Sequence, residues 1–197
     1  MGVEYELKYA ATPQQLQQIR DLMPDECVEF QMRTTYFDTH GDALSDRQIM
    51  LRLRQENDAT VCTVKTPLAD GSRGEWECAC ENIYEGIEKL CQLGAPAELA
   101  ALTACGVQEV CSAAFSRQAY TVSTGEATLE IALDQGVLLG GGRELPLCEV
   151  EVELKAGPMA AADSFAADLA RAFGLKIENR SKFSRALALA RGEEDGL

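Results

Sequence analysis

The sequence has 197 residues, of which 46% are hydrophobic and 25% are charged, and its formal net charge at pH 7 is −14. This length and balance fit a single soluble domain, and no run of 18 apolar residues could form a transmembrane helix. A chain this acidic repels nucleic acids and anionic membranes. An anionic ligand would therefore need a local cluster of basic residues, a bound cation, or both.

The eight cysteines form no C-x-x-C pair, and the only histidine is His40. A zinc site needs several ligands at turn or helix spacings, so we expect none here. The N-terminal residues lack the basic and apolar regions of a secretory signal. We therefore expect a cytoplasmic protein whose cysteines are reduced thiols, most of them packed as small hydrophobic side chains.

Polar and apolar residues alternate over 3–9, which predicts a strand. Thr12, Pro13 and Gln15 have the spacing of an N-cap, a first-turn proline and a capping box, which predicts a helix to about Met23. Seven more strands are predicted over 33–39, 49–56, 59–67, 71–80, 108–123, 126–134 and 147–156. Helices are predicted over 82–93, 96–104, 158–173 and 181–190, with a turn or short helix at 43–48 and a tight loop at 140–146.

Most of these strands follow one another through short turns, which favours an antiparallel sheet. About eight strands, with helices at the start, middle and end of the chain, predict an α+β fold. No internal repeat or interdomain linker is visible. We therefore expect one domain over residues 1–190 and a frayed tail over 191–197.

Charged residues alternate with apolar ones along several strands, and residues two apart in a strand share one face. The signs are grouped, with two glutamates on the first strand, two arginines on a middle strand and three glutamates on the last. The charged faces contain Glu4, Glu6, Lys8, Arg52, Arg54, Arg73, Glu75, Glu77, Glu149, Glu151, Glu153 and Lys155, and other strands add Lys65, Arg117, Glu130 and Asp134.

A sheet with one wet face also alternates polar and apolar residues, which would explain any one of these strands. Here strand after strand repeats the pattern, and like charges that share a face repel one another. Clustered carboxylates then need a cation, and clustered arginines need an anion. The pattern favours an eight-stranded antiparallel β-barrel that forms a polar tunnel, with the helices packed outside.

Such a tunnel suits a polyphosphate with a divalent metal. Mg²⁺ and Mn²⁺ bind carboxylate and phosphate oxygens together. Arginine binds phosphate through bidentate hydrogen bonds, and lysine binds it as a point charge. A strongly acidic chain could therefore still hold a polyanionic substrate.

The stretch Glu4-Tyr5-Glu6-Leu7-Lys8 resembles the ExExK motif of the CYTH superfamily, also called triphosphate tunnel metalloenzymes. The resemblance continues through further blocks in the family's order and spans residues 3 to about 190. These blocks are TYFDT followed by ALSDRQIMLRLR, then TVKTP, RGEWE, LEIALDQG, CEVEVELK and ENRSKFSRAL.

The resemblance implies that the chain hydrolyses inorganic triphosphate to pyrophosphate and phosphate with one or two Mg²⁺ or Mn²⁺ ions. It implies metal binding by Glu4, Glu6, Glu149 and Glu151, and catalysis by these residues with Lys8, Glu130 and Asp134. The implied phosphate ligands are Lys8, Arg52, Arg54, Lys65, Arg117, Lys182 and Arg185. Arg73, Glu75, Glu77 and Glu153 would line the tunnel with less defined roles.

Three alternatives stay open at this point. Relatives also hydrolyse thiamine triphosphate or cyclise ATP as class IV adenylate cyclases, and both reactions need a pocket for an organic group. Trp76 does not supply one, because its parity places it outside the tunnel. The third alternative is a binding module for polyphosphate or nucleotide that has no turnover. The expected partner is a small-molecule triphosphate, not nucleic acid or a membrane, and both a monomer and a homodimer fit the sequence.

Overall fold

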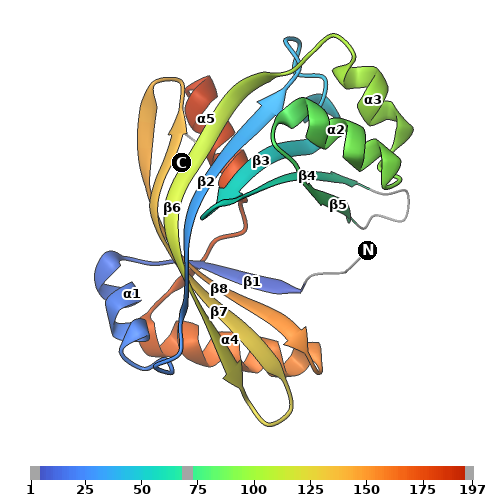
Figure 1. Cartoon of the computed structure of the whole chain (residues 1–197). Helices are drawn as coiled ribbons and strands as arrows, with labels where there is room; N and C mark the ends of the chain where they lie inside the picture. Colours follow the sequence, from blue (N-terminus) through green and yellow to red (C-terminus); the bar gives the residue numbers. More distant parts are fainter. Residues whose placement is uncertain (1–4, 68–72, 194–197) are drawn as a thin grey trace.

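The computed structural model describes residues 5–67 and 73–193, which form one strongly curved antiparallel sheet with helices on both faces (Figure 1). The strand order across the sheet is β5-β4-β3-β2-β6-β7-β8-β1-β9. The strands are β1 (Glu6–Ala10), β2 (Val28–Asp38), β3 (Met50–Glu56), β4 (Ala59–Pro67), β5 (Arg73–Ala79), β6 (Gln108–Ser123), β7 (Thr128–Gly140), β8 (Arg143–Ala156) and β9 (Lys176–Ile177).

The α+β class and the antiparallel sheet are confirmed, but the sheet differs from the expected barrel in two respects. It has nine strands in the described residues, and β5 and β9 are its two edges, so it curves without closing. The added strand is β9, whose Lys176 and Ile177 pair with Ala10 and Tyr9. This pairing occupies the edge of β1 that a closed barrel would offer to β5.

The helices begin where the capping residues predict. The Thr12 hydroxyl accepts a hydrogen bond from the Gln15 amide, and the Gln15 side chain accepts one from the Thr12 amide, which completes the capping box. Asn82 and Ser181 cap two later helices through their side-chain oxygens. The helices are α1 (Pro13–Arg20), α2 (Ile83–Gln92), α3 (Ala97–Thr103), α4 (Met159–Phe173) and α5 (Lys182–Arg191), with a 3₁₀ turn at Ser45–Arg47.

Some boundaries differ from those predicted. The loop predicted over 140–146 is only a two-residue turn, because Gly141 and Gly142 adopt φ values of 58° and 71° that favour glycine. Pro146 lies within β8, opposite Val137. The predicted tail falls outside the described residues from 194 onward, and before it Arg191 is still helical.

Two groups of helices cover the convex outer face of the sheet (Figure 1). Helices α1 and α4 pack over β7, β8 and β1, where Ile131, Val150 and Val152 are fully buried. Helices α2 and α3 pack over β3, β4 and β5, and Trp76 belongs to this cluster, outside the cavity as its parity predicts. Tyr5 and Leu7 also face outward, against the first group.

Helix α5 packs against the concave inner face, although the helices were expected outside. Its Ala186 and Phe183 pack with Phe115 and Leu138 of the sheet. A Cβ atom at Gly140 would lie 2.5 Å from the Ala186 carbonyl oxygen, so this glycine allows the close approach of α5. The helix therefore fills one end of the concave space.

No helix within the described residues is long and apolar enough to cross a membrane. All eight cysteines lie in the described residues, and none of them is in a disulfide there.

Candidate active site

The sheet register places the predicted charged residues on one face. On β8, Glu151 and Glu153 lie opposite Lys8 and Glu6 of β1, and on β7, Asp134 lies opposite Arg117 of β6. Across the other half of the sheet, Lys65 lies opposite Glu75. The strand parities deduced from the sequence therefore meet on the inner face.

This face and α5 enclose a cavity of about 850 Å³. Asp134, Glu149 and Arg185 lie buried behind its wall. Glu4 lies outside the described residues, and nothing is described of the Arg73 side chain at the start of β5. The predicted residues that line the cavity are Glu6, Lys8, Arg52, Arg54, Lys65, Glu75, Glu77, Arg117, Glu130, Glu151, Glu153 and Lys182.

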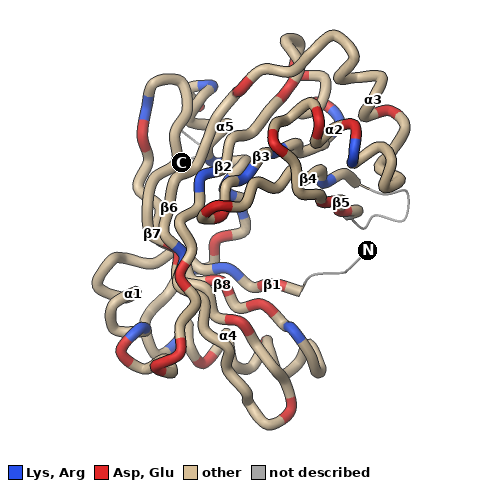
Figure 2. Tube along the Cα trace, in the orientation of Figure 1, with Lys and Arg blue, Asp and Glu red and all other residues tan. Residues whose placement is uncertain are grey.

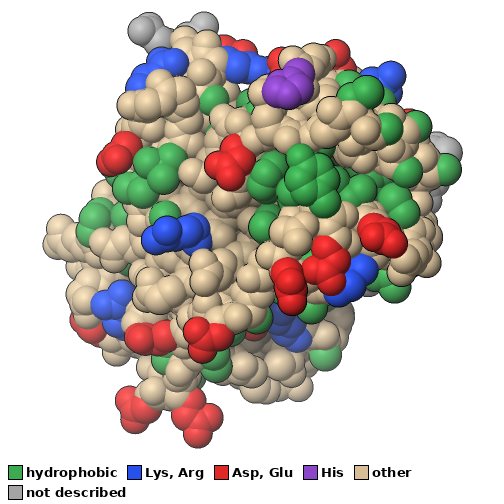
Figure 3. Space-filling view, turned by 45° about the horizontal axis from the view of Figure 1, so that its top comes forward, with side chains coloured by type: hydrophobic (Ala, Val, Ile, Leu, Met, Phe, Trp, Pro, Cys, Tyr) green, Lys and Arg blue, Asp and Glu red, His purple; other side chains and the backbone are tan. Residues whose placement is uncertain are grey.

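The grouping of charges belongs to the inner face. Charged positions recur along β1, β3, β4, β5 and β8 around the concave space (Figure 2). On the outer face that Figure 3 shows, acidic and basic side chains are scattered among uncharged ones. Solvated faces mix signs in this way, so the sorted charges of the cavity point to a ligand.

The β3–β5 side of the cavity carries three basic residues, each with a glutamate nearby. The Arg52 guanidinium lies 3.9 Å from Glu75 and 4.0 Å from Glu77, whereas Arg54 lies 2.9 Å from Glu56. Lys65 pairs with Glu75 at 2.9 Å. Burial, together with the positive charge of Arg52, lowers the pKa of Arg54. An anion in the cavity would offset this repulsion.

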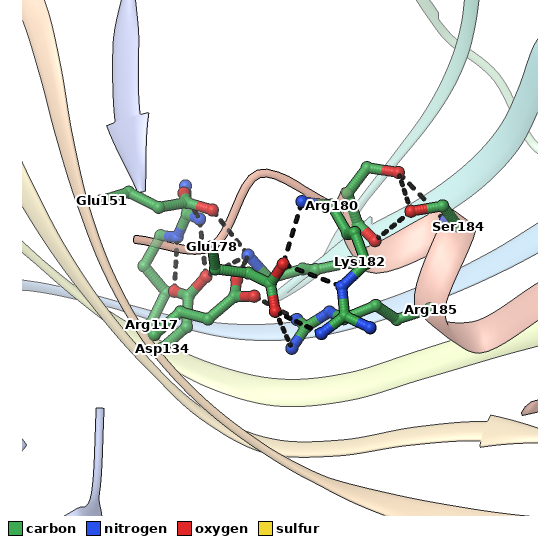
Figure 4. A network of polar contacts seen from close by, with 10 residues as sticks. Arg117, Asp134, Glu151, Glu178, Arg180, Lys182, Ser184 and Arg185 are labelled. Carbon is green, nitrogen blue, oxygen red and sulfur yellow. Dashed lines mark hydrogen bonds and ion pairs between the residues drawn. The ribbon is translucent and has the colours of Figure 1, made fainter. Parts of the chain in front are cut away.

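A second feature, here called the lysine cage, consists of Asp134, Glu149 and Glu151 around the Lys182 ammonium (Figure 4). The Lys182 Nζ lies 2.8 Å from Asp134, 2.5 Å from Glu149 and 2.6 Å from Glu151. Arg117 donates to Asp134 at 2.8 Å and also to Glu151. Arg185 donates to Glu149. Three carboxylates thus meet three cations.

The electrostatics of the cage favour its charged form. Burial disfavours the ionised Glu151, but Lys182 and Arg117 outweigh it and hold the pKa of Glu151 at about 2. Burial would also lower the pKa of Lys182, yet the surrounding Glu151, Asp134 and Glu149 raise it above its usual value. Both partners therefore stay ionised at neutral pH.

A third feature, here called the carboxylate row, consists of Glu6, Glu153 and Glu130, which lie opposite one another on β1, β8 and β7. Like charges directly opposite each other destabilise a sheet. Lys155 offsets part of the repulsion, with its Nζ 2.7 Å from Glu153 and 3.4 Å from Glu130. Among the described residues, Glu6 has no ion pair with any cation.

Glu6 shows how the row fits a divalent metal. Enclosure by the cavity wall and the charge of Glu151 raise the pKa of Glu6 to about 7, although the side chain remains open to the cavity. A cation beside Glu6 would remove this penalty. Carboxylate oxygens are the ligands that Mg²⁺ and Mn²⁺ prefer. The cage has carboxylate oxygens within 4.8 Å of one another, as a metal site needs, but it already holds the Lys182 ammonium, so the row is the part of the cavity whose carboxylates remain available to a metal.

The cavity also has an apolar wall that the strand parities had not suggested. Phe30, Phe115 and Met50 of the sheet line it together with Phe183 and Leu187 of α5. The Phe115 ring lies under two cations, 5.2 Å from Lys182 Nζ and 5.9 Å from the Arg117 guanidinium carbon.

Sequence reasoning missed several charged residues of the site or left them without a role. Glu56, Arg191 and Glu193 line the cavity, and continuing the alternation of β3 by one step would have found Glu56. Lys155 also lines the cavity, and the alternation of β8 had placed it on the charged face without a role. Glu178 and Arg180 join the cage from behind. They follow β9 in a segment without periodicity, and although both stand in the ENRSKFSRAL block, no role was predicted for them.

The model of the CYTH domain matches residues 2–187 of the chain. The chain belongs to the CYTH family. This confirms the resemblance drawn from the ExExK stretch. The inorganic triphosphatase of Haemophilus influenzae is 29% identical over 164 residues, which make up 78% of this chain and 46% of that protein. The chain thus spans about half the length of this curated relative.

Solved structures of CYTH-like proteins share the fold. The protein PH1819 of Pyrococcus horikoshii is 24% identical, with a TM-score of 0.63 over 96% of this chain and 99% of its own. A putative adenylyl cyclase of Hippeastrum, described as having a dominant triphosphatase activity, is 18% identical, with a TM-score of 0.62 over 96% of both chains. At these identities the likeness concerns the fold alone.

Proposed function

We propose that the chain is a metal-dependent triphosphatase that hydrolyses inorganic tripolyphosphate to pyrophosphate and phosphate. The observation that carries the proposal is that one cavity brings together basic residues on β3 and β4 and the carboxylate row on β1, β7 and β8. The family and the activity named for the Haemophilus influenzae relative support it. The proposal includes a cytoplasmic location and a small-molecule substrate.

In this proposal Glu4 and Glu6 hold the metal, with Glu153 and Glu130 beside them. Glu151 borders the row, whereas Glu149 lies behind the cavity wall with Lys182 and Arg185. We therefore keep Glu151 near the metal and assign Glu149 to the cations. When bound, Mg²⁺ or Mn²⁺ would neutralise phosphate oxygens and lower the pKa of a bound water.

The basic residues bind and orient the phosphates. Lys8 has no ion pair among the described residues, and the contacts of Arg52 are long, so both can turn to phosphate oxygens. Arg54 and Lys65 extend this surface along the cavity. Water attacks the terminal phosphorus in line, the bridging P–O bond breaks and pyrophosphate leaves. A carboxylate of the row accepts the proton, and the cations offset the developing charge.

A second candidate is a triphosphate that carries an organic group, such as ATP or thiamine triphosphate. The apolar wall of Phe30, Phe183 and Leu187 favours it, because it offers the surface that strand parity did not reveal. An aromatic ring could stack there while the phosphates reach the basic residues.

A phosphate-release assay separates these functions. Tripolyphosphate, thiamine triphosphate, ATP and long-chain polyphosphate are each supplied with Mg²⁺ or Mn²⁺. We expect the highest kcat/KM for tripolyphosphate, and ATP with Mn²⁺ should give phosphate and no cyclic AMP. Lys8→Ala and Glu4→Gln should each lower turnover by about a hundredfold or more. Tight binding of tripolyphosphate without turnover would instead identify a binding module.

A further inference from the structure

Five charged residues form a chain of alternating sign behind the cavity wall, in the order Arg180, Glu178, Arg185, Glu149 and Lys182 (Figure 4). Only Lys182 at its end lines the cavity. Arg180 and Glu178 belong to the segment after β9, Arg185 belongs to α5 and Glu149 belongs to β8. These five residues thus connect the segment after β9 to Lys182, which borders both the cage and the cavity.

Glu178 is fixed on three sides. Its backbone amide donates to the Lys8 carbonyl oxygen at 2.9 Å, which ties this segment to β1. Its carboxylate accepts from the Arg180 amide at 2.9 Å and from the Arg180 guanidinium at 2.9 and 3.0 Å. The side chain is only 9% exposed. Glu178 is therefore a fixed negative charge, not a mobile surface residue.

Arg185 connects Glu178 to the lysine cage. One of its guanidinium nitrogens lies 3.7 Å from Glu178, and the other donates to Glu149 Oε1. The second oxygen of Glu149 lies 2.5 Å from Lys182 Nζ. Because Arg185 engages one oxygen of a fully buried carboxylate, the other oxygen is presented to Lys182. Arg185 in turn is held between two carboxylates instead of one.

We infer that Glu178 is a positioning residue for Lys182, acting through Arg185 and Glu149 without touching the substrate. The inference rests on the proposed function, and it takes Lys182, which lines the cavity, as one of the cations that offset charge on the transferred phosphate. Without the charge of Glu178, Arg185 keeps one anionic partner and is free to move with Glu149. The ammonium then loses the fixed position on which stabilisation of the transition state depends.

The first test compares Glu178→Gln with Glu178→Asp. Glutamine keeps the size of the side chain and removes its charge, whereas aspartate keeps the charge. We expect Glu178→Gln to lower kcat for tripolyphosphate about tenfold with little change in KM. Glu178→Asp should recover most of the loss. If aspartate is as impaired as glutamine, or if KM alone changes, the inference is overturned.

Glu85 offers a matched control. Like Glu178, it accepts a backbone amide, that of Glu81 at 2.7 Å, and pairs with a cation, Lys89, at 2.7 Å. It lies on α2 at the outer face. Glu85→Gln should leave kcat unchanged while removing a comparable set of contacts. An equal loss of kcat in Glu85→Gln would show that the effect of Glu178 is general destabilisation.

A double-mutant cycle with Lys182→Met tests whether Glu178 acts through Lys182. In that background Glu178→Gln should change kcat by less than about twofold, because the residue that it positions is gone. If the loss of kcat in the double variant equals the product of the losses in the two single variants, the inference is overturned. Circular dichroism establishes folding of each variant, and if the double variant does not fold, the aspartate comparison decides.

The proposed function and this inference fail in different ways. If the native chain binds tripolyphosphate without hydrolysing it, the activity is wrong, and the coupling between Glu178 and Lys182 is measured by the same cycle on the free energy of unfolding. Loss of coupling between Glu178 and Lys182 in that measurement would overturn the inference. If native turnover is present and Glu178→Gln retains it fully, the function stands and the inference is wrong.

Discussion

The lysine cage and the carboxylate row use the same chemistry for opposite purposes. Each has three carboxylates on neighbouring strands, and β7 and β8 contribute to both. In the cage, Asp134 and Glu149 are fully buried and matched by cations of the protein. In the row, Glu6 is open to the cavity, and Lys155 is the one cation of the described residues that pairs with its two neighbours.

The difference follows from where cations of the protein can reach. Helix α5 enters the concave face at the level of the cage and brings Lys182 and Arg185. Within the described residues no cation forms an ion pair with Glu6, although the charges of Lys182, Lys8 and Arg117 partly offset the rise in its pKa. Carboxylates are thus neutralised where the fold supplies cations of the protein. Where it does not, they stay available to a metal.

The largest expected effect separates the two regions by stability. Without metal, Glu149→Gln should lower the free energy of unfolding by about 3 kcal/mol, because it leaves buried cations without their partner. Glu153→Gln on the same strand should stay within about 1 kcal/mol of the native protein, since it also relieves repulsion from Glu6 and Glu130. Urea unfolding measures both. Equal losses would show that the regions do not differ.

The second prediction concerns metal binding. Saturating Mn²⁺ should raise the melting temperature of the native protein, because a ligand that binds only the folded state stabilises it. Glu6→Gln should lose most of this rise, and Glu85→Gln on the outer face should keep it. Scanning calorimetry with and without Mn²⁺ gives the result. If Mn²⁺ raised the melting temperature of Glu6→Gln as much as that of the native protein, the metal would not bind at the row.

The third prediction uses pH in the metal-free protein. The pKa of Glu6 is raised from 4.5 to about 7, so its contribution to stability is complete below about pH 4.5 and is lost as pH rises through about 7. The pKa of Glu151 is lowered to about 2, so its contribution is present above about pH 4.5 and is lost as pH falls toward 2.

Unfolding of the native protein, Glu6→Gln and Glu151→Gln across this pH range checks the two signs. The advantage of the native protein over Glu6→Gln should shrink as pH rises, and its advantage over Glu151→Gln should shrink as pH falls. Parallel curves for the two variants would contradict the contrast between row and cage.

The smallest expected effect comes from Lys155. Its ammonium occupies Glu153 and Glu130, so a metal entering the row competes with it. Lys155→Met should lower the Mn²⁺ concentration for half-maximal binding by a few-fold, since an exposed ion pair contributes less than about 1 kcal/mol. A Mn²⁺ titration followed by electron paramagnetic resonance detects this. Weaker binding in Lys155→Met would mean that the lysine assists the metal.

Strand parity predicted much of the site from the sequence. Arg52 and Arg54 face the cavity while Leu51 is fully buried on the other face, and Trp76 lies with Leu51. The period of two is a local property of a strand, so it needs no knowledge of the fold. The helix predicted over 181–190 placed Lys182 in its first turn, which the structure directs to the cavity wall.

Strand parity could not show which carboxylates belong to the carboxylate row and which belong to the lysine cage. Glu149 and Glu153 share a strand and a face, and they differ only in their distance from α5, which follows about 30 residues later in the sequence. The docking of α5 depends on the gap at Gly140 and on the apolar surface around Phe115. These are tertiary contacts without a local signature. The role of Glu178, which opens the ENRSKFSRAL block, was missed for the same reason.

The location of bound Mn²⁺ tests the central claim most directly. Anomalous diffraction from crystals of the native protein grown with Mn²⁺ would show the ion by its own scattering. The account predicts a peak at the carboxylate row, coordinated by Glu6, with Lys182 still among Asp134, Glu149 and Glu151. A peak inside the cage, with the Lys182 ammonium displaced, would contradict it.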